Sequence, residues 1–385
     1  MKKTAGTRRP ETARTSLKHI ADATGFSVST VSAVLGGRAE KIGIAEGTRA
    51  TVVAAAEALD YHPNLHARSL RSRTTTLVGL MVPTLNNRFF SEMAETFERV
   101  ARNNGKLPLI TVTNYDRKEE VDSLKYYLSQ DVQCVFNANP TALGELTELC
   151  TAAGTRQILL DAPDTGRHTV TTDNYQASLV LTRLLLDSLA AERRTGRVYF
   201  VGGMASHEVT KLRLGGFRTA LQERGIRYSA DLFQETLFDA ESAYRRVELL
   251  FRSRSDVAGM YVNSLLPMDG VVKFFGEHAD VCRPVHYGVF DHHPMMNLLV
   301  DLHICAIRQN PELMMQRAWE IFADPAAHEP ERTQFVPYEL VVTPKVRRFL
   351  PDARTSAGAD REPARASGTN PLKRRGPTRR SGSGR

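Results

Sequence analysis

The chain has 385 residues, a formal net charge of +8 at pH 7 and four cysteines. This length predicts two or three domains with enough apolar material for a sizeable core. No apolar run reaches membrane-spanning length, and the first residues are polar rather than a hydrophobic signal segment, so we expect a cytoplasmic protein with no membrane partner. The widely scattered cysteines lack metal-ligand spacing, which indicates reduced structural thiols.

The positive charge is concentrated at the two ends of the chain. Residues 1–73 hold 12 Lys/Arg against 6 Asp/Glu, and residues 351–385 hold 9 against 3, whereas the segment between them holds 30 against 34. A basic head on a mildly acidic body is typical of a protein that contacts nucleic acid with one end. The last stretch is rich in Pro, Gly, Ser and Arg and is expected to be disordered; it adds either non-specific DNA affinity or only a solvated appendage.

Residues 16–36 fit two short helices joined by a tight glycine turn. Ser16 and Ser27 stand where each helix needs an N-cap, and Gly25 permits the backbone of the turn. Three-and-four spacing gives the first helix an apolar face of Leu17, Ile20, Ala21 and Thr24. On the second helix it predicts buried Val31, Val34 and Leu35 and outward Val28, Ser29, Ser32 and Ala33. This geometry suits a DNA major groove, although an ordinary helical hairpin in a soluble core has the same spacing.

A third helix is expected over Glu46–Asp60, and a short fourth helix follows it. Pro63 ends the third helix and Asn64 can cap the next, which spans barely two turns and is too short to be stable alone in water. An exposed leucine, Leu70, among arginines suits a helix that DNA and a partner copy stabilise, because apolar wedges open base steps from the minor groove. The alternative is a linker that is merely helical.

Residues 75–345 alternate apolar strand runs with amphipathic helices. Leu77–Val82 is followed by Phe89–Asn104, Leu107–Val112 by Glu119–Ser129, and the pattern recurs as far as Gly270–His278. Repeated strand–helix units of this length predict an α/β core of two doubly wound parallel-sheet lobes. In such sheets ligands bind in the crevice at the carboxyl ends of the strands.

The chain resembles the LacI/GalR family of transcription regulators over residues 16–345. The resemblance rests on Ile20-Ala21-x-x-x-Gly25-x-Ser27-x-x-Thr30-Val31-Ser32 and on Tyr61-x-Pro63-Asn64-x-x-Ala67-Arg68-x-Leu70. The insertion Gly37–Ile44 is similar to that of the fructose and sucrose repressor branch. The resemblance implies a small all-α helix-turn-helix head, a hinge helix, and a periplasmic-binding-protein-like core with the ligand between its lobes. Ala45 replaces the family's usual Ser or Thr cap, so the third helix is expected to fray at its start.

The resemblance also implies a set of DNA contacts. Val28 and Ser29 occupy the two positions that relatives use for specificity, with Val28 expected against a thymine methyl and Thr30 on a phosphate. Leu70 is expected to wedge into the central step of the operator. The complete set of expected DNA-binding residues is Ser27, Val28, Ser29, Thr30, Ser32, Ala33, Arg38, Asn64, Ala67, Arg68 and Leu70.

In the core the resemblance implies an effector site. Arg213 stands in Lys211–Phe217, which matches the family's R-x-x-G-F segment, and a guanidinium fork suits vicinal hydroxyls, carboxylate or phosphate. Asp291 stands in a match to the family's F-D-D-x-P loop, in which His292 replaces the second acid. The other expected effector-binding residues are Arg88, Phe89, Phe90, Asp161, Phe238 and Asn263. Pro267 suggests an altered loop after Asn263.

One charge argument bears on the effector. Arg213, Lys211 and Arg88 would gather at one cleft, and an unpaired cation in a partly dry cleft is costly unless something balances it. This favours a phosphorylated sugar, such as a fructose phosphate, over a neutral sugar. In the alternative, Arg88 and Lys211 point to solvent and only Arg213 meets a neutral sugar's hydroxyls.

Nothing in the sequence favours a metal, a cofactor or catalysis. His292 and His293, with His286 and His303, raise the question of a metal, but adjacent residues point apart and no His-x-x-x-His spacing lies nearby. A phosphate-binding glycine loop, an activated serine and a Cys–His pairing are all missing, so we expect a non-enzyme.

The sequence therefore predicts a homodimeric, sequence-specific DNA-binding regulator, a repressor of sugar-utilisation genes controlled by a sugar or sugar phosphate. The alternatives are a transport-type sugar-binding protein and a regulator that activates rather than represses. The expected domains are a disordered arm (1–15), a helix-turn-helix domain (16–62), a hinge helix and linker (63–74), a two-lobed effector-binding and dimerisation core (75–345) and a disordered basic tail (346–385).

Overall fold

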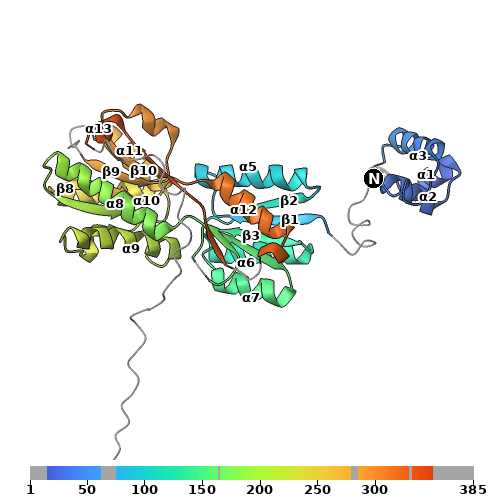
Figure 1. Cartoon of the computed structure of the whole chain (residues 1–385), viewed down its shortest axis with the longest axis horizontal. Coiled ribbons are helices and arrows are strands. Elements are labelled where there is room, and N and C mark those ends of the chain that lie inside the picture. Colours follow the sequence, from blue (N-terminus) through green and yellow to red (C-terminus); the bar gives the residue numbers. More distant parts are fainter. Residues whose placement is uncertain (1–14, 62–74, 164, 279–284, 329–331, 350–385) are drawn as a thin grey trace, which may run out of the picture. The chain divides into compact units, whose positions relative to one another are not determined.

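The computed structural model describes residues 15–61, 75–163, 165–278, 285–328 and 332–349 (Figure 1). The chain divides into two compact units, Met1–Thr75 and Thr76–Arg385. Among the described residues there is no helix long and apolar enough to cross a membrane. The expected hinge residues 62–74, which include Asn64, Ala67, Arg68 and Leu70, lie outside the described residues.

The first unit is a three-helix head. Its helices are α1 (Leu17–Thr24), α2 (Val28–Leu35) and α3 (Glu46–Ala58). Gly25 ends α1 with φ of 72°, and the Ser27 hydroxyl accepts the N–H of Thr30 at 3.1 Å, so the glycine turn and the serine cap of α2 are confirmed. The helices enclose a small core of Ile20, Ala21, Val31, Val52 and Ala56.

The outward face of α2 is narrower than expected. Val28 is exposed to 46%, whereas Ser32 and Ala33 are each only 5% exposed, so the prediction that these two side chains face outward is wrong. The backbone of the following loop folds back on this end of α2, where the N–H of Arg38 donates to the Ala33 carbonyl at 3.0 Å. The insertion before α3 therefore covers the second half of α2. Only the first turn of α2 remains exposed.

The amino-terminal lobe of the second unit is built on a parallel sheet of order β11-β5-β4-β3-β1-β2. The strands are β1 (Leu77–Val82), β2 (Leu107–Val112), β3 (Cys134–Ala138), β4 (Arg156–Leu160), β5 (Thr169–Thr171) and β11 (Thr333–Phe335). Helices α5 (Arg88–Asn103) and α12 (Pro311–Ala323) pack together on one face, and α6 (Arg117–Ser129) and α7 (Leu143–Ala153) pack together as a second pair (Figure 1).

The carboxy-terminal lobe repeats this plan with the order β12-β10-β9-β8-β6-β7. Its strands are β6 (Arg197–Val201), β7 (Phe233–Gln234), β8 (Val257–Val262), β9 (His286–Phe290), β10 (His303–Arg308) and β12 (Glu339–Val342). The helices are α8 (Asn174–Ala191) packed on α9 (Glu208–Glu223), α10 (Ala240–Ser253) packed on α11 (Leu265–Glu277), and the short α13 (Pro344–Arg347). Three 3₁₀ turns complete the described elements: η1 (Ala230–Leu232), η3 (Pro294–Leu298) and η4 (Ala326–His328).

The predicted two-lobed α/β core is confirmed, with one difference in strand direction. The chain passes between the lobes at residues 172–173, 309–310 and 336–338, and after the third passage β12 pairs with β10 in the antiparallel sense. All other strand pairs are parallel among the described residues. No helix lies between the third passage and β12, so this strand starts at the cleft edge and runs opposite to its neighbour β10.

Two predicted domain ends are corrected. Val346 is fully buried in α13, so the core continues to at least Phe349 and the tail does not begin at residue 346. At the other end, the Thr15 hydroxyl donates to the Leu59 carbonyl at 3.0 Å and therefore belongs to the head.

Candidate effector cleft and DNA-binding surface

Arg213 is the centre of a buried polar cluster between the two lobes. Because α9 begins at Glu208, Arg213 lies in its second turn, and it is 3% exposed. Its Nε donates to Asn174 Oδ1 and its Nη1 to the Asn263 carbonyl, each at 2.7 Å. The guanidinium carbon lies 3.6 Å from the centre of the Phe290 ring. The fork is thus fixed by four partners in the protein, of which Asp161, 3.9 Å away, is the acidic one.

Two buried carboxylates accompany this single guanidinium. Asp161, at the end of β4, accepts from Asn174 at 3.1 Å and from Asn139 at 3.2 Å. Asp291, after β9, accepts from Gln309 at 2.7 Å. Burial raises the pKa of Asp291, although Arg213 acts to lower it. The cluster therefore holds two carboxyl groups against one guanidinium, and its amides hold the carboxyl groups in place.

Backbone strain is concentrated at the same place. Tyr115, Asn139, Asp161, Phe238 and Asp291 all have positive φ, between 44° and 80°, which side-chain-bearing residues rarely adopt. All five follow strands and line the carboxyl edges of the two sheets or the loops beside them. Strained backbone of this kind persists where the surrounding structure enforces it, and it is typical of ligand sites.

Two aromatic rings meet between the lobes. Tyr115, after β2, stacks on Phe238, which precedes α10, with ring centres 4.8 Å apart and planes 12° apart. The His207 ring packs edge-on against Phe238 at 5.4 Å. Burial raises the pKa of Tyr115, and the charge of Asp161 adds to the effect. The stack joins the lobes near the polar cluster.

A cavity of about 480 Å³ opens beside the cluster. Asp291 and Gln309 form its inner wall, and Arg88, Phe89 and His292 lie among its other lining residues. Gln309 Oε1 is buried and has no hydrogen-bond partner, and the same holds for Asn263 Oδ1, whose Nδ2 donates to Thr210 at 3.3 Å. Asn139 Oδ1 is likewise buried without a partner, so three amide oxygens in this region lack a donor.

Several expected positions are corrected by the structure. Phe90 is 2% exposed and packs in the core of the amino-terminal lobe, so only Phe89 of this pair reaches the cavity. Pro267 does not lie in a loop but in the first turn of α11, behind the Ser264 N-cap, where a missing N–H costs nothing. Cys134, Cys150 and Cys305 are buried free thiols, as expected.

The predicted excess of cations at the cleft is wrong. Lys211 pairs with Glu208 at 2.6 Å and Arg88 pairs with Glu92 at 2.5 Å, both within one helical turn and about half exposed. His292 bonds Asn297 at 3.1 Å, and burial lowers its pKa, so it adds no positive charge at neutral pH. The argument for an anionic effector loses its basis.

The first turn of α2 and the loop after it present the candidate DNA-binding surface. Val28, Ser29 and Arg38 are exposed and Thr30 is partly so. The Ser27 hydroxyl lies 2.7 Å from that of Ser29 and 2.8 Å from that of Thr30, so the three hydroxyls form one polar edge beside Val28. Ser32 and Ala33 do not contribute to this surface in the described head.

Sequence reasoning missed Tyr115, Asn139, Asn174 and Gln309. Each lies at the end of a strand or just after one, so the rule that ligands meet the carboxyl ends of parallel strands was the signal available for them. No local pattern marks which of many strand-end residues meet across two lobes.

A helix-turn-helix head followed by a two-lobed α/β core with a polar interlobe cluster defines a DNA-binding protein that also binds a small molecule. Comparison with known proteins agrees with this class. Residues 16–64 match the family model "Bacterial regulatory proteins, lacI family", and residues 78–329 match "Periplasmic binding protein domain".

The chain is 34% identical to the ribitol operon repressor of Klebsiella aerogenes over 185 residues, which is 48% of this chain and 68% of that protein. It is 25% identical to the sucrose operon repressor of Klebsiella pneumoniae over 319 residues, 81% of this chain and 91% of that protein. The chain belongs to the LacI family of bacterial regulatory proteins.

Among solved structures, the lac repressor dimer bound to operator and an anti-inducer superposes with a TM-score of 0.71 at 20% identity, covering 85% of this chain and 98% of that one. The Cra regulator of Pseudomonas putida in complex with fructose 1-phosphate gives a TM-score of 0.60 at 19% identity, covering 70% and 99%. At these identities the structures support the fold.

Proposed function

We propose that this protein is a transcriptional repressor that binds an operator through two copies of its head. A neutral polyhydroxylated molecule at the interlobe cluster either weakens or strengthens this operator binding. The observation that carries the proposal is the combination of an exposed, capped recognition helix with a strained, buried polar cluster in a separate unit. The relatives named above as operon repressors support the regulatory role.

The DNA-binding surface comprises the first turn of α2, with Val28 and Ser29 toward base edges, and Ser27, Thr30 and Arg38 toward phosphates. The hinge residues Asn64, Ala67, Arg68 and Leu70 complete it by the resemblance of their motif. The boundaries that go with this role are a head of 15–62, a hinge of 63–74, a core of 75–349 and a basic tail beyond it.

The effector is a neutral sugar or sugar alcohol. Two carboxylates already outnumber the one guanidinium of the cluster, so a phosphate would add a third anion to a buried place. Asn263 Oδ1 and Gln309 Oε1 need donors, which the hydroxyl groups of a polyol supply. The name of the ribitol operon repressor agrees with a polyol.

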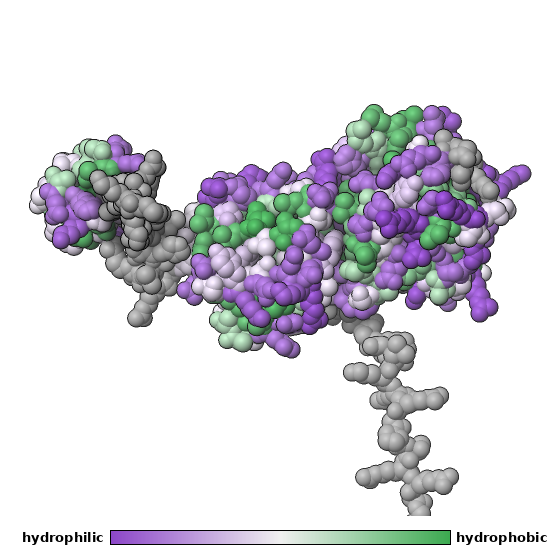
Figure 2. All heavy atoms as spheres, turned by 180° about the vertical axis from the view of Figure 1, so that it is seen from behind, coloured by the Kyte–Doolittle hydropathy of each residue, from purple (hydrophilic) through white to green (hydrophobic). Residues whose placement is uncertain are grey.

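A homodimer is the assembly that this function needs, because two heads read two half-sites. Figure 2 shows hydrophobic surface among hydrophilic surface on the core. In and beside η3 four large apolar side chains, Met295, Leu298, Val300 and Leu302, are each at least 40% exposed, which suits a contact with a second copy. Binding to chromosomal DNA also requires a cytoplasmic protein, and no reaction chemistry is needed for this role.

Isothermal titration of the full chain with ribitol, ribose, fructose and fructose 1-phosphate tests the effector class. Binding of one of the neutral compounds at least about tenfold tighter than the phosphate, and its loss in Asp291→Asn, is the expected result. Tighter binding of fructose 1-phosphate would overturn the neutral effector while leaving the DNA-binding role intact.

A further inference from the structure

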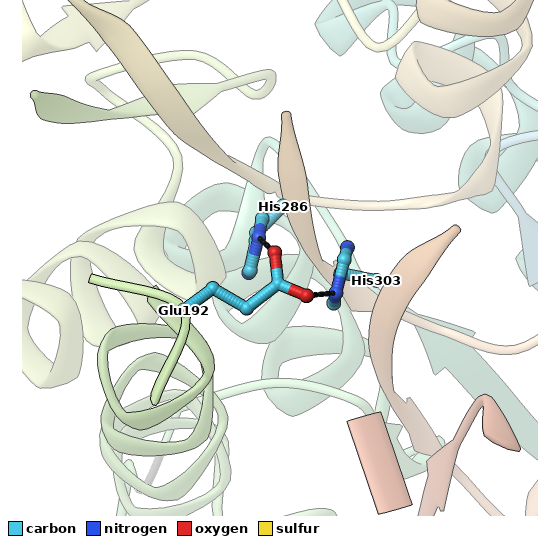
Figure 3. A group of neighbouring side chains, drawn as sticks. All are labelled: Glu192, His286 and His303. Carbon is cyan, nitrogen blue, oxygen red and sulfur yellow. Dashed lines mark hydrogen bonds and ion pairs between the residues drawn. The ribbon is translucent and has the colours of Figure 1, made fainter. Parts of the chain in front are cut away.

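A second polar cluster lies in the carboxy-terminal lobe, apart from the effector site. His286 and His303 are the first residues of the adjacent parallel strands β9 and β10 and stand opposite each other in register. Their rings are parallel within 2°, with centres 3.9 Å apart. Glu192, the residue that ends α8, extends its carboxylate to both of them, as Figure 3 shows.

The three side chains present their ligand atoms to one point. Glu192 Oε1 lies 2.7 Å from His303 Nε2, and Glu192 Oε2 lies 3.4 Å from His286 Nε2. All three ligand atoms fall within 4.8 Å of one another. The imidazoles are buried, whereas the Glu192 side chain is 24% exposed, so one side of the cluster is open to solvent.

One nitrogen of this cluster is not satisfied. His286 is fully buried, and its Nδ1 is held by the Ser188 hydroxyl at 2.8 Å. Its Nε2 makes no hydrogen bond of ordinary geometry, although it is directed at the Glu192 carboxylate. A buried nitrogen without a hydrogen bond of ordinary geometry is unfavourable, so the arrangement is incomplete as it stands.

A hydrogen bond from Nδ1–H to a neighbouring oxygen is the usual partner of a histidine that binds a metal through Nε2. Ser188 can accept that proton, which leaves the Nε2 lone pair directed at the cluster. The sequence analysis considered His286 and His303 together with His292 and His293, but not Glu192, which lies 94 residues before His286 along the chain.

We propose that Glu192, His286 and His303 bind a zinc-class divalent cation, with water as the fourth ligand on the exposed side. Two imidazole nitrogens and one carboxylate oxygen are a ligand set that Zn²⁺ accepts with an open position. Tetrahedral binding needs ligand atoms about 3.3 Å apart, so the two stacked rings turn out of parallel and the Glu192–His303 hydrogen bond is exchanged for metal bonds. The ion ties the end of α8 to the starts of β9 and β10.

The experiment uses the untagged full chain, treated with chelator and then titrated with Zn²⁺ by calorimetry and with Co²⁺ by visible absorption. We expect one ion per chain and Co²⁺ absorption typical of tetrahedral coordination. Glu192→Gln, which keeps the size of a partly exposed side chain, should lower Zn²⁺ affinity by about 100-fold or more. His303→Gln should do the same.

His293→Gln is the matched control, because His293 lies outside the cluster and is only partly buried. It should bind Zn²⁺ as the parent does. The absence of stoichiometric binding in the parent would overturn the proposal, and so would equal binding by the parent and Glu192→Gln. In the presence of chelator, Glu192→Gln and the parent should bind operator with equal affinity. This result shows that the variant is folded, and it keeps the metal test separate from the proposed function.

Discussion

Replacing Arg213 by Met should destabilise the core strongly, because it leaves carboxylates buried without their cation. The guanidinium is 3% exposed and has Asn174, the Asn263 carbonyl, Asp161 and the face of Phe290 around it. Removing one partner of a buried ionic group costs about 3–5 kcal/mol. At about 2–4 °C per kcal/mol for a unit of this size, the melting temperature should fall by about 6–20 °C.

The assay is thermal unfolding of the full chain, with Arg245→Met as control. Arg245 pairs with Glu241 one helical turn away on the exposed face of α10, so its loss should cost no more than about 0.5 kcal/mol. Adding Asp161→Asn to Arg213→Met should recover about 1–3 kcal/mol, because it removes one of the stranded carboxylates. A drop for Arg213→Met no larger than that for Arg245→Met would refute the reasoning.

Four further predictions follow from individual contacts. Gly270→Ala should lower the melting temperature of the carboxy-terminal lobe by several degrees, because its Cβ would lie 2.1 Å from the Ala240 carbonyl oxygen. Gly276→Ala on the same helix meets open space and should stabilise the lobe by about 0.5–1 kcal/mol. Thermal unfolding of both variants checks this, and equal effects would contradict it. Phe238→Ala should weaken effector binding at least about tenfold in calorimetry, because it removes the ring that stacks on Tyr115 across the lobes, and unaltered affinity would count against a cleft role for the stack. Asp291→Asn should raise the melting temperature at pH 7, because burial raises the pKa of Asp291 in the folded state and ionisation above that pKa costs stability. The gain in melting temperature should vanish as the pH falls below the ordinary carboxyl pKa. A gain that grew at low pH would contradict this reasoning. Exchanging Val28 for another residue should change base preference at one operator position by about 1–3 kcal/mol in a randomised-site selection, and an unaltered preference would remove Val28 from the base-reading surface.

Local patterns predicted the local structure well. Gly25, Ser27 and the three-and-four spacing placed α1 and α2, and the alternation of apolar runs with amphipathic helices placed the two lobes. Those features depend on neighbours within a few residues. The prediction that Ser32 and Ala33 face outward was wrong, because the loop that covers them comes from an insertion. The helical period does not encode the path of that insertion.

The cleft was predicted only in part. Arg213, Asp161 and Asp291 were found through motif resemblance, and they do meet in one buried cluster. Tyr115 and Gln309 were not found, because their roles depend on which strand ends face each other across the lobes. Lys211 pairs with Glu208 and Arg88 pairs with Glu92 at helical spacing, so the sequence already contained an acidic partner for each of these two cations.

The central claim is that occupancy of the Arg213 cluster controls sequence-specific DNA binding by the head. It is tested most directly by fluorescence anisotropy of the full chain on a duplex obtained from randomised-site selection, with and without the neutral polyol found by calorimetry. We expect the selected duplex to be bound at least about 1,000-fold more tightly than random duplex. The polyol should change the affinity for the selected duplex by about 5–150-fold. In Arg213→Lys the polyol should leave this affinity unaltered. Equal affinity for selected and random DNA, or an operator affinity that no bound polyol alters, would contradict the account.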